Sequence, residues 1–158
     1  MEKVDLIEKN YKDAVSGINT TWLTEPSLEW YNYITHLPKY PQMVYTLMVF
    51  DNQVFNGGFH QYFYNTFGQF AVETIDFLIE IKAFNKSRLL KKALDATSVG
   101  YENLESFRLD ILKRRVRAMF ENQSLIELLE EVNEEYDNDD SEDITDLLEP
   151  YLADNISQ

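Results

Sequence analysis

The chain has 158 residues, of which 44% are hydrophobic and 14% aromatic, and its formal net charge is −14. It has no cysteine, which excludes disulfide bonds, thiolate metal sites and cysteine nucleophiles. The N-terminus alternates charged and apolar residues, and the longest mainly apolar run, 43–50, is too short to cross a bilayer. These features predict a single soluble domain in the cytoplasm, with enough apolar residues to bury a core.

Most of the chain shows the apolar spacing of amphipathic helices, with glycine, proline or polar links between the segments. The predicted helical segments that precede the acidic end are 2–18, 26–37, 41–54, 59–67, 70–82, 86–99 and 101–120. The third is apolar on most sides, which predicts that it is largely buried. No segment shows the period-two alternation of a strand between turn signals. We therefore predict an all-α fold, a single compact multi-helix domain of about eight helices.

Two adjacent glycines, Gly57 and Gly58, separate the third segment from the densest aromatic cluster of the sequence. Because glycine accepts a positive φ and has no Cβ, they predict a sharp turn between two packed helices. We expect Asn56 to cap this turn. The aromatic residues that follow have helical spacing on one face, which predicts the hub of the core. They are Phe59, Tyr62, Phe63 and Phe67.

The net charge lies entirely at the C-terminal end. Residues 1–117 carry 14 acidic and 14 basic side chains, whereas residues 118–158 carry 14 acidic side chains and no lysine or arginine. Ser124 and Glu127 form a capping-box pattern at the start of a predicted helix that runs to about Tyr136. A charged link, 137–143, leads to a last helix over 144–152. Both helices have an apolar face, so we expect them to pack on the neutral body.

The outward face of these two helices and their link is the candidate partner-binding surface. Its residues are Glu127, Glu130, Glu131, Glu134, Glu135, Asp139, Asp140, Asp143, Asp146 and Glu149. Such a surface attracts the basic face of a DNA-binding protein at long range, with a strong dependence on salt. Two alternatives stay open: a solvated face that keeps the protein soluble, and neutralisation of the face by the basic cluster Lys113–Arg117.

The run Asn56–Asn65, followed by Gly68, resembles the signature of the DNA-mimic protein domain family, and the helices over 26–120 resemble that bacterial domain. The motif residues, which we expect to be mainly structural, are Asn56, Gly57, Gly58, Phe59, Gln61, Tyr62, Phe63, Asn65 and Gly68. The family is named for a member that presents acidic side chains in place of DNA phosphates. The resemblance implies a non-catalytic protein without a cofactor that binds a basic DNA-binding protein, such as a transcription regulator.

Two other functions remain open. The same charges suit an interaction or immunity module that neutralises a basic partner without copying DNA geometry. A pocket beside the glycine turn, with His60, Tyr64 and Asn65, is the candidate for small-molecule binding or catalysis, although the sequence contains no recognised catalytic motif. We therefore predict no catalytic residues.

The sequence also bears on metal binding, nucleic-acid binding and self-association. Asp137, Asp139 and Ser141 match the first ligand positions of an EF-hand loop, but Glu142 replaces its glycine and Leu148 its bidentate glutamate, so we expect no metal site. The large negative charge argues against direct binding of nucleic acid. No membrane contact is expected, and a homodimer remains possible because the apolar faces of the terminal helices suit a subunit interface as well as a core.

Overall fold

The computed structural model describes residues 4–114 and 121–156, and every regular element within them is helical. The α-helices are α1 (Leu6–Val15), α2 (Glu29–Thr35), α3 (Lys39–Tyr64), α4 (Ala71–Glu80), α5 (Phe84–Thr97), α6 (Leu104–Leu112), α8 (Gln123–Asn138) and α9 (Ile144–Asn155). Two short 3-10 helices, η1 (Thr20–Leu23) and η2 (Phe67–Phe70), lie between them. The prediction of an all-α single domain is confirmed.

The predicted starts of the second helix and of the first acidic helix are wrong, each for a local reason. The second helix begins at Glu29 and not at Pro26, because the chain is still leaving η1 there: the Glu25 N–H donates to Thr21 O at 3.1 Å. Helix α8 is capped by Asn122, whose Oδ1 accepts from the Leu125 N–H at 3.1 Å. Ser124 is therefore already inside the first turn, and the capping box predicted there does not form.

The segment predicted over 101–120 is helical from Leu104 to Leu112, and its residues from 115 onward lie outside the described ranges.

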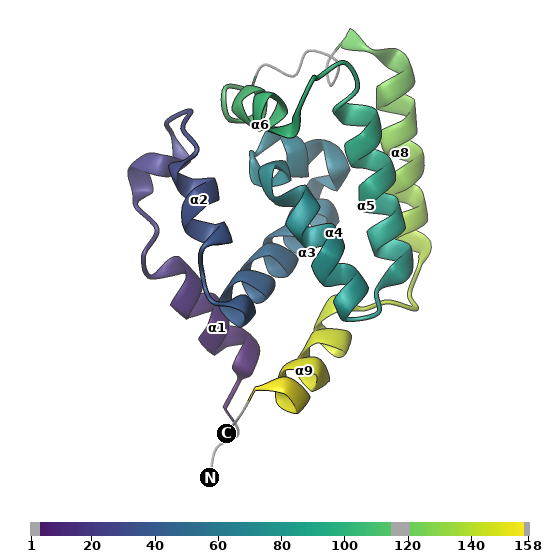
Figure 1. The fold of residues 1–158 in the computed structure, drawn as a ribbon. Coiled ribbons are helices and arrows are strands. Elements are labelled where there is room, and N and C mark those ends of the chain that lie inside the picture. The colour runs from purple at the N-terminus through teal and green to yellow at the C-terminus, as the bar shows by residue number, and fades with distance from the viewer. Residues whose placement is uncertain (1–3, 115–120, 157–158) are drawn as a thin grey trace.

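Helix α3 is the centre of the fold, and it contacts α1, α4, α8 and α9 (Figure 1). It bends at Gly58, where φ is 75° and ψ is −173°, which confirms the predicted glycine turn. Large side chains on both sides of the bend are buried, as the sequence predicted. They include Met43, Val44, Tyr45, Leu47, Phe50, Phe59, Tyr62 and Phe63.

The other helices lie around α3. In Figure 1, α1 and α2 lie to the left of α3, while α5 and α8 lie side by side on the right and α9 crosses the lower end. On the left, a smaller cluster forms around Trp30, whose ring meets those of Phe67 and Phe70 edge-on at centroid distances of 5.5 Å. This cluster joins the N-terminal helices to α3 and η2 through aromatic packing.

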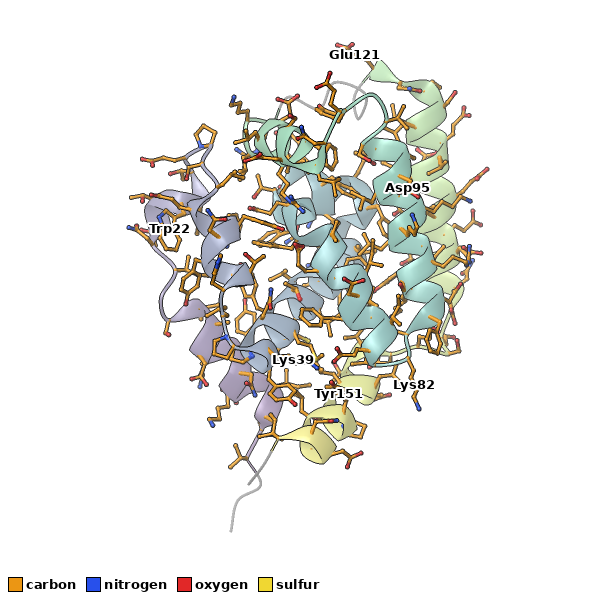
Figure 2. All side chains as sticks on the ribbon, viewed as in Figure 1. Trp22, Lys39, Lys82, Asp95, Glu121 and Tyr151 are labelled. Atoms are coloured by element: carbon orange, nitrogen blue, oxygen red, sulfur yellow. The ribbon has the colours of Figure 1, made fainter. Side chains whose placement is uncertain are left out.

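The two C-terminal helices belong to the main core. Their buried apolar residues are Leu125, Leu129, Val132, Tyr136, Ile144, Leu148 and Leu152. Polar contacts also hold α9: Glu80 of α4 accepts from the Tyr151 hydroxyl and pairs with Lys39 at 3.1 Å, at the lower end of the molecule (Figure 2). Within the described ranges, no helix has both the length and the apolar character needed to cross a membrane.

Candidate functional site

Helix α8 separates its apolar and acidic residues onto opposite faces. Leu129 and Val132 are almost fully buried against the body, whereas the glutamates that alternate with them are exposed. The exposed glutamates are Glu127, Glu130, Glu131, Glu134 and Glu135. All five were predicted from the helical period, and the structure places them on the outer side of the helix or at its edge with α5. Within the part of the chain that the structure describes, Glu127 accepts a single, long hydrogen bond, 3.4 Å, from Gln123 Nε2.

The acidic link between α8 and α9 is partly used to hold the fold. Asp139 Oδ1 accepts from the Ser141 N–H at 2.9 Å, and its Oδ2 accepts from Asn85 Nδ2 at 2.5 Å. These hydrogen bonds, led by those from Ser141, lower the pKa of Asp139. Asp143 caps α9 by accepting from the Asp146 N–H at 2.9 Å. Of the candidate surface, Asp139 is half-buried, while Asp140, Asp143, Asp146 and Glu149 are exposed.

Glu142 has a structural role that the sequence did not reveal. Its two carboxylate oxygens accept from the backbone N–H groups of Asn85 and Lys86, both at 2.8 Å. A carboxylate at this position satisfies otherwise unpaired donors and complements the positive end of the dipole of α5. The link is thereby fixed to the start of α5, 56 residues away along the chain.

Intramolecular neutralisation of the candidate surface is slight within the described ranges. There, Glu135 makes the one ion pair that any of the ten predicted carboxylates forms, with Arg88 Nη2 at 2.9 Å. Lys113 is exposed, and Arg114 lies over the ring of Tyr64, 5.5 Å from its centroid. Arg115 and Arg117, the other basic residues of the cluster proposed to neutralise the surface, lie outside the described residues.

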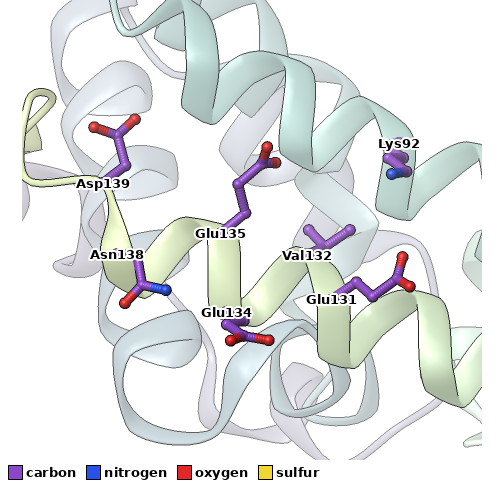
Figure 3. A pocket seen from close by; sticks show the side chains of 7 residues that line it. All are labelled: Lys92, Glu131, Val132, Glu134, Glu135, Asn138 and Asp139. Atoms are coloured by element: carbon purple, nitrogen blue, oxygen red, sulfur yellow. The ribbon is translucent and has the colours of Figure 1, made fainter.

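A groove of about 570 Å³ runs between α5 and α8. Figure 3 shows Lys92 on α5 and the carboxylates of Glu131 and Glu135 on the side of α8 that faces it, whereas Glu134 points away. This edge of the acidic surface therefore has both signs of charge. On the side of α8 turned away from α5, Glu127, Glu130 and Glu134 form no ion pair within the described ranges.

Side chains of the glycine-turn motif form hydrogen bonds across the bend of α3. Gln61 Nε2 and Asn65 Nδ2, after the bend, both donate to Gln53 Oε1, before it, at 3.1 and 2.9 Å. Gln61 also covers Gly57 so closely that a Cβ built there would lie 2.0 Å from Gln61 Oε1. At the end of the motif, a Cβ at Gly68 would lie 2.2 Å from the ring of Phe63.

The predicted cap of the turn is wrong. The Asn56 side chain is exposed and makes no hydrogen bond within the described ranges, whereas the Phe59 N–H donates to Asn133 Oδ1 of α8 at 2.7 Å. The cap comes from α8 because Gly58 lets the backbone approach that helix: a Cβ at Gly58 would lie 2.4 Å from Asn133 Nδ2. Sequence reasoning missed Asn133 because its partner is 74 residues away. The only signal was an amide near the apolar face of an otherwise acidic helix.

The predicted pocket beside this turn has little geometric support. Four hollows formed by residues 4–114 and 121–156 are lined by residues other than His60, Tyr64 and Asn65. His60 is half-buried, and its burial lowers its pKa while Glu130 acts in the opposite direction. Among the described residues, no group of three or more histidines and carboxylates is placed to hold a metal ion.

The sequence was also compared with known proteins. A family model described as DMP19-like protein matches residues 35–155. The chain belongs to this family. The match begins near the end of α2 and continues through α9, so it includes both acidic helices and extends beyond residue 120, where the noted resemblance of the helices ended. No curated protein and no solved structure matches the chain.

Proposed function

We propose that this chain is a non-catalytic acidic protein whose C-terminal surface stands in for DNA phosphates and binds a basic DNA-binding protein, such as a bacterial transcription regulator. The proposal places the protein in the cytoplasm, where such regulators act. Its main support is a set of four exposed glutamates on α8 that make no ion pair within the described ranges. They are Glu127, Glu130, Glu131 and Glu134.

The spacing of these carboxylates is compatible with the spacing of phosphates. The helix rises about 1.5 Å per residue, so the four glutamates advance about 3.5 Å each on average, close to the ~3.4 Å between phosphates along one DNA strand. They are not in a single line, since successive members alternate between neighbouring positions around the helix. The four glutamates therefore place negative charges along α8 about as densely as phosphates lie along a DNA strand. The mixed-charge groove beside α5 bounds this acidic surface on one side.

The rigidity of the acidic surface also supports the proposal. Leu129 and Val132 bury the inner side of α8, and Asn133 binds the bend of α3. The link is fixed through Glu142 to the start of α5. A fixed array of charges loses less conformational entropy on binding than a flexible acidic tail does. At the glycine turn, the side-chain amides of Gln53, Gln61 and Asn65 hydrogen-bond to one another. This favours partner binding at the acidic surface over catalysis at the turn.

The test is capture of a partner from a bacterial lysate at low salt, followed by elution with rising salt and, separately, with excess duplex DNA. We expect the protein to retain a DNA-binding protein that both treatments release. The test variant reverses four charges on α8 and should lose this capture: it carries Glu127→Lys, Glu130→Lys, Glu131→Lys and Glu134→Lys. The matched control reverses four exposed charges on the body and should keep it: it carries Asp13→Lys, Glu25→Lys, Glu102→Lys and Glu105→Lys.

The outcomes separate the proposal from its alternatives. Equal capture by the two variants would contradict the proposal, because the variants have the same net charge and differ only in where it lies. A retained basic protein that duplex DNA fails to displace would favour the alternative of an interaction or immunity module that neutralises a basic partner. Circular dichroism of both variants verifies that the helices are intact.

A further inference from the structure

A second feature of the acidic end is a hollow of about 400 Å³ where α3, α5, α8 and the acidic link meet. Asp51 and Phe55 come from α3, Lys86 from α5, and Tyr136 from α8. Asp137 near the end of α8 and four residues of the link complete the lining, so the hollow contains six carboxylates and one ammonium. It is distinct from the glutamate row of α8, none of whose four unpaired members lines it.

Most carboxylates of the hollow are already engaged within the fold. Asp51 Oδ1 accepts from the Tyr136 hydroxyl at 2.6 Å, and Asp139, Glu142 and Asp143 hold the link and the starts of α5 and α9 as described above. The remaining two, Asp137 and Asp140, are exposed and make no hydrogen bond or ion pair within the described ranges. They are the carboxylates available to a partner.

Phe55 lies with them and is 79% exposed, although it belongs to a helix whose other phenylalanines are buried. An exposed aromatic ring among carboxylates is unfavourable for an isolated surface and favourable for a cation with a flat face. A guanidinium group stacks on an aromatic ring and pairs with carboxylates at the same time, which an ammonium does less well. A hard divalent cation would gain nothing from the ring.

Lys86 supplies an independent indication of a ligand. Its side chain is only 8% exposed, and its Nζ forms a long ion pair with Asp51 Oδ1 at 4.0 Å and a cation–π contact with the Tyr136 ring, whose centroid is 4.5 Å away. An ammonium has three N–H donors, and the 4.0 Å separation from Asp51 is longer than a hydrogen bond. The ammonium lines the hollow with donors to spare, so an occupant gains by presenting an oxygen acceptor as well as a cation.

We propose that this hollow receives an arginine residue from an exposed segment of the protein partner. The guanidinium lies against Phe55 and pairs with Asp137 and Asp140, and a main-chain carbonyl of the same segment accepts from Lys86. The inference rests on the proposed function for the nature of the partner, a basic DNA-binding protein. It adds a specific side-chain contact to an attraction that is otherwise long-range and non-specific.

The test uses short capped peptides and isotope-labelled full-length protein observed by NMR. The probe is acetyl-Ala-Arg-Gly-Arg-Ala-amide, and its two relatives replace arginine with lysine or with neutral citrulline. We expect the arginine peptide to shift the backbone signals of Phe55, Lys86 and residues 137–140. The lysine peptide should bind more weakly, and the citrulline peptide should not bind.

Variants locate the contact. Phe55→Ala and Asp140→Asn should each raise the Kd of the arginine peptide about five-fold, as expected for the loss of a cation–π contact or of one charge partner. Val99→Ala, which removes a side chain that is 76% exposed elsewhere, and Asp154→Asn on α9 are the matched controls and should leave the Kd unchanged. Signal changes confined to the glutamates of α8, or equal effects of Phe55→Ala and Val99→Ala, would overturn the inference.

Failure of this inference is distinguishable from failure of the proposed function. Capture of a DNA-binding protein that Phe55→Ala leaves unchanged would contradict the arginine contact while supporting the proposed function. Binding of the arginine peptide at the hollow without capture of any DNA-binding protein would support the arginine contact and contradict the proposed function.

Discussion

Gly58 is the residue on which the geometry of the central helix depends. Its φ of 75° and ψ of −173° lie in a region that essentially only glycine occupies, and its Cα faces the side chain of Asn133. Gly100 also has a positive φ, 90°, but a Cβ there would meet nothing within 4 Å. Comparing alanine substitutions at the two positions therefore distinguishes the effect of backbone strain from that of a steric clash.

We expect Gly58→Ala to lower the free energy of unfolding by about 2–4 kcal/mol, because strain and the clash with Asn133 act together. Gly100→Ala should lower it by only about 1–2 kcal/mol, through strain alone. Urea denaturation of the two variants and the parent protein measures both values. Equal losses would mean that the helix pair relaxes around the new methyl group and that close contact at Gly58 is not required.

At the scale of elements, the contact between α8 and the bend of α3 fixes how the acidic surface is presented. Asn133 Oδ1 accepts from the Phe59 N–H, and the apolar side chains on either side of Asn133 set the rotation of α8. The rotation decides which glutamates face outward. The cap therefore contributes to the geometry of the candidate surface as well as to the stability of the fold.

Asn133→Ala leaves the Phe59 N–H without its acceptor, and we expect it to lower the free energy of unfolding by about 1–2 kcal/mol. Asn133→Asp keeps an acceptor and places a negative charge at a helix start, so its effect should stay within about 0.5 kcal/mol. Asn138→Ala is the control, since that side chain is exposed on the same helix. A loss in the aspartate variant as large as in the alanine variant would show that packing, and not capping, is the role of Asn133.

The elements were predictable wherever a local pattern decides the structure. The helical period gave the inner and outer faces of α8, and the glycine pair gave the bend at Gly58. Local patterns failed where tertiary contacts decide. Asn56 and Ser124 have good capping chemistry in sequence, but Asn133 and Asn122 form the caps in the structure.

The candidate site shows the same division. Exposure of the glutamates follows from period, but the period cannot tell which carboxylates are free. Glu135 pairs with Arg88, and Glu142 caps a helix that begins more than fifty residues earlier. The hollow beside Phe55 was also beyond prediction, because three helices and a link that are distant in sequence build it.

At the scale of the whole molecule, charge and fold are separated along the chain. The body, residues 1–117, is neutral, and all the net charge belongs to residues 118–158. The described ion pairs lie mostly within the body, as Lys39–Glu80 and Arg108–Glu73 do, so they compensate charges that were already balanced. The acidic helices are left with repulsion that their apolar faces must outweigh.

This repulsion has a measurable consequence. Three like-charged pairs on α8 have i,i+4 spacing, namely Glu127 with Glu131, Glu130 with Glu134, and Glu131 with Glu135. At about 0.2–0.5 kcal/mol each, they destabilise the fold by roughly 1 kcal/mol at low ionic strength. Raising the salt from 0.01 M to 1 M shortens the Debye length from about 30 Å to about 3 Å, which screens neighbours ~5–6 Å apart.

We therefore expect the Tm to rise by about 2–4 °C over this range of NaCl, the shift that about 1 kcal/mol produces in a protein of this size. The variant with Glu127, Glu130, Glu131 and Glu134 all changed to Gln should start from a higher Tm and rise less, because the repulsion has been removed. Scanning calorimetry of both proteins measures the difference. A Tm that falls with salt would mean that attraction between opposite charges outweighs this repulsion. Neutralisation of the acidic helices by the cluster Lys113–Arg117 would have that effect. The surface would then be a poor imitation of DNA, because its charge would already be satisfied within the molecule.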